Sequence, residues 1–342
     1  MANLISSRFL GANRLEVSAL GFGAMALSGV YEEADENEAI KTVHRAIELG
    51  IRLIDTADFY TKGQRTADAE WGHNEKLIGR ALKGYRDKVK VSTKVGAVIL
   101  PDGTVSQDGR PEYIREAVEG SLQRLGIDHI DLYYLHRVDP KVPIEDTVGA
   151  LGQLVTEGKV GGIGLSEASP TNIRKAHSIH PITAIQSEYS LVTRDPEQVV
   201  LPTCRELGIG FVPFASLGRG LLTGAIRKPE DMAENDWRRA AAPRFQSGNL
   251  ERNIGLVCQL GEIADRLGVQ IPQLALAWLL HQGDDIVPLF GAVTPDVLEV
   301  NVVGAHIQLD KAVVDEISSI FDPESVSGDR YPPAFMAQID RD

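Results

Sequence analysis

Short apolar runs that alternate with longer amphipathic stretches dominate this sequence. Eight such runs occur between residues 19 and 290, and they lack the polar alternation of a strand with one wet face. Strands that read as continuous apolar runs are typical of a parallel sheet covered on both faces. The expected strands are Ala19–Gly23, Ile51–Ile54, Val89–Thr93, Ile130–Leu135, Val160–Leu165, Ile182–Gln186, Ile209–Pro213 and Ile286–Phe290.

The stretches between these runs carry helical periodicity and helix-end signals. Apolar side chains recur at helical spacing in residues 112–125, and Gly126 is a suitable terminator. Asp35 with Glu38 matches a capping box at the start of a helix, and a third apolar stripe runs through residues 144–155. Strands alternating with helices predict right-handed crossovers, and the count of eight favours a closed (β/α)₈ barrel over an open sheet.

Some segments lie outside this repeat. Residues 8–18 alternate around a turn and predict a hairpin that caps the bottom of the barrel. Residues 215–250 form a long Gly- and Pro-containing loop, and a loop of this length indicates function or mobility. Residues 310–321 predict an extra helix, followed by a Pro-containing irregular tail. No internal repeat or linker is evident, so a single domain over residues 1–342 is the simplest interpretation.

Charge and composition exclude several functional classes. Forty-eight acidic residues against 35 basic ones give a net charge of −13, which repels nucleic acids and anionic membrane surfaces. No window reaches the ~18 uninterrupted apolar residues of a membrane helix. The N-terminus lacks a signal-peptide pattern, and the two cysteines form no framework or CxxC pair, so we expect a cytoplasmic protein. The scattered histidines predict no metal site.

Reactive side chains occur where consecutive strands are expected to end. Asp55 follows the second strand directly with Tyr60 five residues later, Lys94 ends the third strand, and His136 ends the fourth. Each has an ordinary structural explanation when taken singly, as a cap, a packing aromatic or a rim charge. The active sites of (β/α)₈ barrels lie at the carboxyl ends of the strands, so their joint occurrence predicts an active site.

This set of side chains suits proton transfer to oxygen. A tyrosine hydroxyl has an ordinary pKa of about 10, and a neighbouring ammonium lowers it by favouring the phenolate. Asp55 would keep Lys94 charged and oriented, and His136 would hydrogen-bond the same substrate oxygen. A tyrosine tuned in this way can protonate a developing alkoxide, which is the step that carbonyl reduction needs beside a hydride donor.

These residues lie in stretches that resemble the aldo-keto reductase family. The similarity continues through Gly218–Gly224 to Asn301, and Gly164–Glu167 resembles a branch of bacterial and plant enzymes with Gly-Leu-Ser-Glu after strand five. The resemblance implies a (β/α)₈ barrel, a nicotinamide dinucleotide, a small carbonyl substrate, and a tetrad with Tyr60 as general acid/base. The stretches that carry it are Leu20–Met25, Ile54–Tyr60, Val91–Lys94 and Asp131–His136.

The expected cofactor site depends mainly on the resemblance, because no strand–GxGxxG–helix fingerprint occurs. Ser166 and Gln186 would hold the carboxamide, and Phe214 stands where the family usually has a stacking tyrosine. The run Leu217–Gly220 would bring backbone N–H groups and the Arg219 guanidinium to the pyrophosphate. The full expected set is Gly23, Met25, Ser166, Gln186, Phe214, Leu217, Gly218, Arg219, Gly220, Gly291 and Asn301.

The segment after strand eight departs from the family pattern. Val293, Thr294 and Val297 stand where lysine or arginine is common, and Asp296 would repel the 2′-phosphate of NADP. NADP(H) is therefore the family default, while the residues leave NAD(H) open. Basic residues of the long loop offer alternative partners for the phosphate, namely Arg238, Arg239 and Arg244.

Two alternatives remain beside carbonyl reduction. A Schiff-base lyase could use Lys94 as nucleophile, although Asp55 would keep that lysine protonated. A non-catalytic barrel could bind the nicotinamide cofactor and report redox state to a partner, as some family members act as channel subunits. The oligomeric state is not readable from the sequence.

Overall fold

A closed parallel barrel forms the centre of the molecule. The computed structural model describes residues 5–31, 34–63 and 70–342. Its main sheet has the order β11-β10-β9-β8-β5-β4-β3-β12, and an isolated parallel bridge from Phe211 to Ile286 joins the two edges. The barrel strands are β3 (Gly21–Gly23), β4 (Leu53–Asp55), β5 (Lys90–Val95), β8 (Leu132–Leu135), β9 (Ile163–Ser166), β10 (Ala184–Glu188), β11 (Gly210–Phe214) and β12 (Leu289–Phe290).

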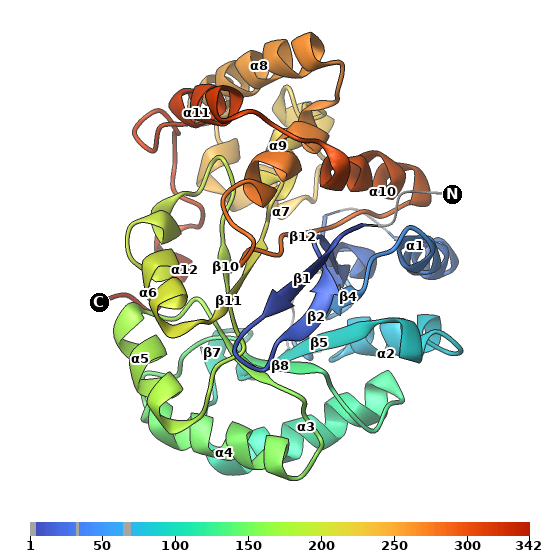
Figure 1. Cartoon of the computed structure of the whole chain (residues 1–342), viewed down its shortest axis with the longest axis vertical. Coiled ribbons are helices and arrows are strands. Elements are labelled where there is room, and N and C mark those ends of the chain that lie inside the picture. The colour runs from blue at the N-terminus through green and yellow to red at the C-terminus, as the bar shows by residue number, and fades with distance from the viewer. Residues whose placement is uncertain (1–4, 32–33, 64–69) are drawn as a thin grey trace.

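Helices surround this barrel, as Figure 1 shows. They follow the strands in the order that right-handed βα crossovers require. The helices are α1 (Glu36–Glu48), α2 (His73–Ala81), α3 (Pro111–Leu125), α4 (Ile144–Thr156), α5 (Pro170–Ile179), α6 (Val200–Leu207), α7 (Trp237–Ala241), α8 (Asn249–Leu267), α9 (Ile271–Leu280), α10 (Pro295–Val302), α11 (Lys311–Ile320) and α12 (Pro333–Met336).

The (β/α)₈ barrel expected from the sequence is confirmed, and each expected strand run overlaps one observed barrel strand, with ends that differ by up to three residues. The helix-end signals also hold: the Asp35 side chain accepts a hydrogen bond from the Glu38 amide at 2.9 Å, and Gly126 ends α3 in the left-handed conformation at φ 66°. The extra C-terminal helix is α11.

Two small elements were not anticipated. A hairpin of β6 (Ala97–Ile99) and β7 (Val105–Gln107) follows β5, and its strands of three residues each are too short to stand out in the sequence. The tail expected to be irregular contains the short helix α12.

The predicted N-terminal hairpin closes the bottom of the barrel. It consists of β1 (Ser7–Leu10) and β2 (Leu15–Ser18), paired antiparallel. Leu10 and Val17 are almost fully buried and pack into the barrel interior with Leu53, Leu132 and other apolar side chains. The lower interior is thus filled by apolar groups, which leaves the polar side chains for the opposite rim.

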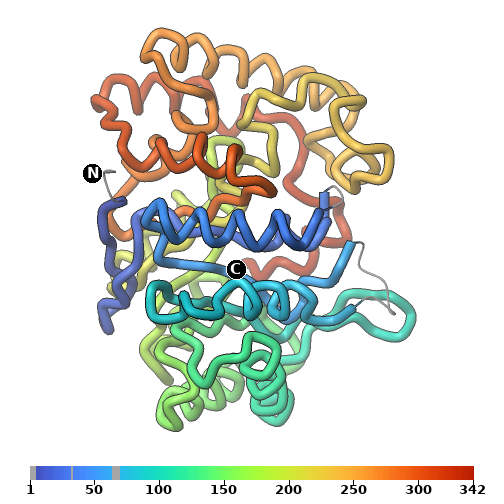
Figure 2. The backbone as a smooth tube through the Cα atoms, turned by 90° about the vertical axis from the view of Figure 1, so that its right-hand side faces the viewer, coloured from blue at the N-terminus to red at the C-terminus, as the bar shows by residue number. Residues whose placement is uncertain are grey.

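Figure 2 shows the two ends of the barrel from the side. The dark blue hairpin lies at the left, and the yellow loop that follows β11 lies at the right, beyond the carboxyl ends of the strands. Within the described part of the chain, no helix has both the length and the apolar character needed to cross a membrane.

Candidate active site

Two neighbouring strands bring a carboxylate and an ammonium together at the rim. Asp55 is the last residue of β4 and pairs in register with Ser92 of β5, two residues before Lys94. Side chains alternate along a strand, so Ser92 and Lys94 point to the same side. The Lys94 Nζ donates to Asp55 Oδ1 at 2.5 Å and to the Thr56 carbonyl oxygen at 2.7 Å.

The segment after β4 folds back over this pair and places Tyr60 next to Lys94. The Thr56 amide donates to the Ser92 carbonyl at 2.9 Å, and the Asp58 amide donates to the Lys94 carbonyl at 3.3 Å. These bonds extend the β4–β5 ladder beyond the strand, and a tight turn then reverses the chain. As a result, the Tyr60 hydroxyl accepts a hydrogen bond from the Lys94 Nζ at 3.1 Å.

Asp55 and Lys94 form a buried ion pair, and both groups make further hydrogen bonds. Their exposed fractions are 3% and 1%, and Asp55 Oδ2 accepts from the Ser92 hydroxyl at 2.7 Å and from the Gln186 amide at 3.0 Å. Burial favours the neutral amine, but the charge of Asp55 and the phenol of Tyr60 outweigh it, so the pKa of Lys94 is held above its ordinary value. We call Asp55, Tyr60 and Lys94 the lysine cluster.

His136 completes the expected tetrad at the end of β8. Its ring lies edge-on to the rings of Tyr60 and Phe59, with centroids 5.9 and 5.8 Å apart. The next residue, Arg137, donates to the His136 carbonyl at 2.6 Å and to the Ser166 hydroxyl at 3.1 Å. The structure therefore brings the four predicted catalytic side chains to one site, with Ser166 beside it.

Most of the residues expected to bind the cofactor lie at the ends of barrel strands or in the loops that follow them. Gln186 and Ser166 are register partners on β10 and β9, and both are buried. Phe214 ends β11 and is half-buried, whereas Asn301 is buried in α10. The remaining members are Gly23 at the end of β3, Met25 just after it, Leu217, Gly218, Arg219 and Gly220 after β11, and Gly291 after β12.

The loop after β11 is bent by three consecutive left-handed residues. Gly218, Arg219 and Gly220 have φ angles of 58°, 55° and 94°. Glycine adopts this region freely, whereas an arginine there is unusual. Runs of such residues can turn backbone N–H groups toward an anion, which fits a phosphate-binding loop.

The Arg219 side chain does not follow its backbone toward such an anion. Its guanidinium pairs with Glu188, a fully buried carboxylate at the end of β10, and lies 4.4 Å from the centroid of the Tyr331 ring. The sequence suggested pyrophosphate as the partner of this guanidinium, but here the guanidinium is directed into the protein.

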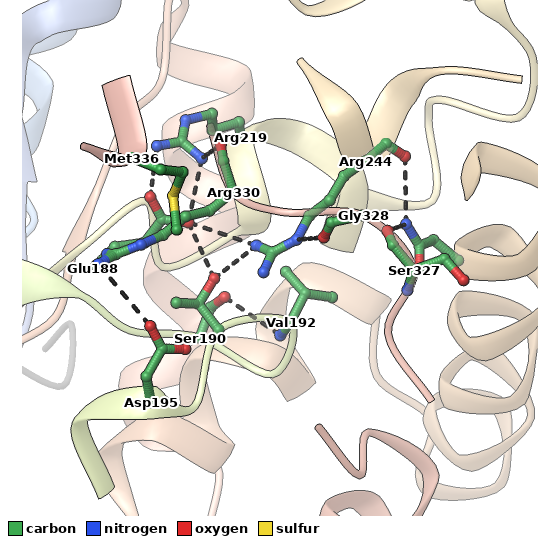
Figure 3. A network of polar contacts seen from close by, with 12 residues as sticks. Glu188, Ser190, Val192, Asp195, Arg219, Arg244, Ser327, Gly328, Arg330 and Met336 are labelled. Carbon is green, nitrogen blue, oxygen red and sulfur yellow. Dashed lines mark hydrogen bonds and ion pairs between the residues drawn. The ribbon is translucent and has the colours of Figure 1, made fainter. Parts of the chain in front are cut away.

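Glu188 belongs to a larger buried cluster that the sequence analysis missed. Its carboxylate also accepts from the Thr193 hydroxyl at 2.9 Å and lies 3.5 Å from Arg244 Nη1. Arg330 of the C-terminal tail pairs with Glu167 at 2.8 Å, and Arg219 Nη1 donates to the Arg330 carbonyl at 3.2 Å. Figure 3 shows Glu188 with Arg219, Arg244 and Arg330 around it. We call Glu167, Glu188, Arg219, Arg244 and Arg330 the arginine cluster.

The start of α10 presents an acidic side chain, as expected from the sequence. The Thr294 hydroxyl caps the helix by accepting from the Val297 amide at 3.4 Å, and Asp296 is exposed in the first turn. Further along, Glu299 pairs with Arg45 at 2.6 Å. Two of the three alternative phosphate partners from the long loop are engaged elsewhere: Arg238 pairs with Asp236, and Arg244 is buried in the arginine cluster.

Comparisons with known proteins agree with this architecture. The family model described as "Aldo/keto reductase family" matches residues 19–322. A probable aldo-keto reductase 1 from Glycine max is 44% identical over 324 residues, which cover 94% of this chain and 90% of that protein. The solved structure of a glycerol dehydrogenase from Gluconobacter oxydans superposes with a TM-score of 0.80 at 29% identity, covering 93% of this chain and 96% of that one. The chain therefore belongs to the aldo/keto reductase family.

Proposed function

We propose that the protein is an NAD(P)H-dependent reductase that converts an aldehyde or ketone to an alcohol, reversibly, with Tyr60 as general acid/base. The observation that carries the proposal is the 3.1 Å hydrogen bond between the Lys94 ammonium and the Tyr60 hydroxyl oxygen. Asp55 and the Thr56 carbonyl fix this ammonium from the other side, so it cannot turn away from the phenol.

The proton step follows from this arrangement. In reduction, the Tyr60 hydroxyl gives its proton to the substrate oxygen, and the phenolate left behind is stabilised by the adjacent ammonium. His136 lies next to Tyr60 and would orient the same oxygen by hydrogen bonding. Tyr133 and Tyr134 on β8 are unsuitable for this role, because burial raises the pKa of both well above the ordinary value.

The residues present fit the nicotinamide end of the cofactor. Ser166 and Gln186 offer polar groups in register beside the lysine cluster, and Phe214 offers a half-buried aromatic face. The left-handed backbone of residues 218–220 would hold the pyrophosphate through N–H groups. When bound, the reduced nicotinamide would supply the hydride that reaches the carbonyl carbon.

At the adenosine end of the cofactor, we expect the protein to discriminate only weakly between NADPH and NADH. The N-terminus of α10 favours an anion, but Asp296 opposes it, and no lysine or arginine occurs in residues 291–301. A 2′-phosphate placed there would gain little, so we expect NADH to bind nearly as well as NADPH.

The alternatives are weaker. Schiff-base chemistry needs a neutral amine, and the raised pKa of Lys94 keeps it as an ammonium at neutral pH. A non-catalytic, cofactor-binding barrel predicts binding without turnover, yet the tetrad is complete and assembled.

The test combines cofactor titration with one substitution. Purified protein is titrated with NADPH and NADH in parallel by nicotinamide fluorescence, and turnover is measured on aldehydes, ketones and polyols, including glycerol, because a structural relative is a glycerol dehydrogenase. Tyr60→Phe should bind cofactor normally and lose turnover by about 100-fold or more.

Turnover of Tyr60→Phe near the wild-type rate would show that another group transfers the proton. Tight cofactor binding with no turnover on the whole panel would favour the regulatory alternative. Borohydride trapping of a substrate on Lys94 would favour the lyase.

A further inference from the structure

Glu167 holds together the two strand ends that carry the expected carboxamide ligands. It directly follows Ser166 of β9, and its amide donates to the Gln186 carbonyl at 3.0 Å. Its carboxylate accepts a hydrogen bond from the Glu188 amide at 2.7 Å. Glu167 therefore contacts the β10 backbone at Gln186 and again at Glu188, so a movement of Glu167 would shift Ser166 and Gln186 together.

The backbone conformation and the burial of Glu167 are both unfavourable by themselves. Its φ angle is 55°, a left-handed conformation that a residue with a side chain rarely adopts, and its side chain is 2% exposed. A buried carboxylate without a partner is strongly unfavourable, so the turn can persist only if the charge is neutralised.

The C-terminal tail supplies the positive charge that neutralises Glu167. Arg330 Nη2 and Nη1 lie 2.8 and 3.1 Å from the two oxygens of Glu167, a bidentate arrangement in which the guanidinium side chain is 7% exposed. Asp195 lies near the same guanidinium at 3.8 Å. The Arg330 carbonyl also accepts a hydrogen bond from Arg219, which links the tail to the loop after β11.

The tail is anchored on both sides of Arg330. The Ser327 amide donates to the Asn253 side chain of α8 at 2.9 Å, and Asp340 accepts from the Ser169 amide at the start of α5 at 2.8 Å. These anchors fix the path of the tail across the rim, so the position of Arg330 is determined by more than its own ion pair.

We infer that Arg330 is a positioning residue for the nicotinamide site, acting through Glu167 on Ser166 and Gln186. The inference rests on the proposed function, because it assigns Ser166 and Gln186 to the cofactor. The C-terminal tail would then contribute to the cofactor site indirectly, because the Arg330 guanidinium contacts Glu167.

The test is Arg330→Met in the full chain, which keeps an unbranched side chain but removes the charge and the fork of donors. We expect the Kd for NADH and NADPH to rise about 10- to 100-fold, as for other residues that orient a ligating group, with kcat at saturating cofactor much less affected. The matched control is Arg341→Met, an exposed arginine of the same tail, which should bind cofactor as the wild type does.

A second variant separates positioning from general stability. Arg330→Met combined with Glu167→Gln removes both charges and keeps an oxygen that accepts from the Glu188 amide, so the Kd should return most of the way to the wild-type value. Where Arg330→Met alone fails to fold, Arg330→Lys keeps the charge without the bidentate fork and should raise the Kd by a smaller factor.

The outcomes distinguish this inference from the proposed function. An Arg330→Met or Arg330→Lys protein that is less stable to urea but binds cofactor with unchanged Kd overturns the inference and leaves the proposed function standing. A wild-type protein that binds neither NADH nor NADPH overturns the proposed function, and the inference falls with it.

Discussion

Two buried ion-pair clusters lie at the same rim of the barrel and are built in different ways. The lysine cluster joins neighbouring strands, and its tyrosine is half-buried, so one member can reach a substrate. The arginine cluster joins the ends of β9 and β10 to the long loop after β11 and to the C-terminal tail, and it contains three guanidiniums and two buried carboxylates. The lysine cluster contains a phenol that can give up a proton beside a fixed ammonium, whereas the guanidiniums of the arginine cluster stay charged at any ordinary pH. The first cluster therefore suits chemistry, and the second suits the placement of loops.

The largest effect should come from breaking the lysine cluster. Lys94→Met removes the ammonium that stabilises the phenolate, so we expect turnover to fall by about 1,000-fold or more, within the range of general acid–base effects. The same change leaves Asp55 buried without its counter-charge, which should lower the free energy of unfolding by about 3–5 kcal/mol. Steady-state kinetics and urea unfolding measure the two losses.

Lys90→Met is the matched control on the same strand. The Lys90 side chain is 42% exposed and its ammonium pairs with Asp131 at 3.1 Å, so stability should change by less than about 1 kcal/mol. Adding Asp55→Asn to Lys94→Met should recover stability without recovering turnover. Recovery of turnover would mean that the ion pair serves the fold and not the proton transfer.

The lysine cluster was predictable because its members are placed by short-range rules. Asp55 and Lys94 lie at the ends of strands that are visible as apolar runs, and parallel strands bring their ends together. The same rule places His136, which directly follows β8, beside the lysine cluster. Ser92, which the sequence analysis missed, shares the face of Lys94 through the two-residue period of a strand. Only the exact approach of Tyr60 needed the observed turn.

The arginine cluster could not be predicted in the same way. Arg330 lies 163 positions from Glu167, in a tail without periodicity that was expected to be irregular. The Gly-rich loop after β11 was recognisable. The direction of the Arg219 side chain, however, depends on a left-handed backbone angle that cannot be predicted from the sequence. Long-range pairings of charged side chains leave no local pattern in the sequence.

Removing the Glu188 charge from the arginine cluster should affect mainly stability. Glu188→Gln keeps the shape of the side chain and removes the charge beneath Arg219 and Arg244, so we expect the free energy of unfolding to fall by about 3–5 kcal/mol. Urea unfolding monitored by circular dichroism measures it. The control is Glu206→Gln in the exposed pair with Arg174, where solvent screening should make the loss much smaller. Equal losses in the two variants would contradict a special role for the buried cluster.

The smallest effect concerns an ion-pair group outside both clusters. The hydrogen bond from Arg80, followed by that from His73, lowers the pKa of Glu36 from 4.5 to about 2. A carboxyl whose pKa is lowered on folding stabilises the protein above the unfolded pKa, and this contribution is lost as the pH falls through about 2. Because Arg80 is 50% exposed, the contribution should be less than about 1 kcal/mol. Glu36→Gln should therefore be slightly less stable than wild type in urea at pH 7 and equal to it near pH 2. A difference that persists at the acid end would trace the effect to packing of the side chain and not to its charge.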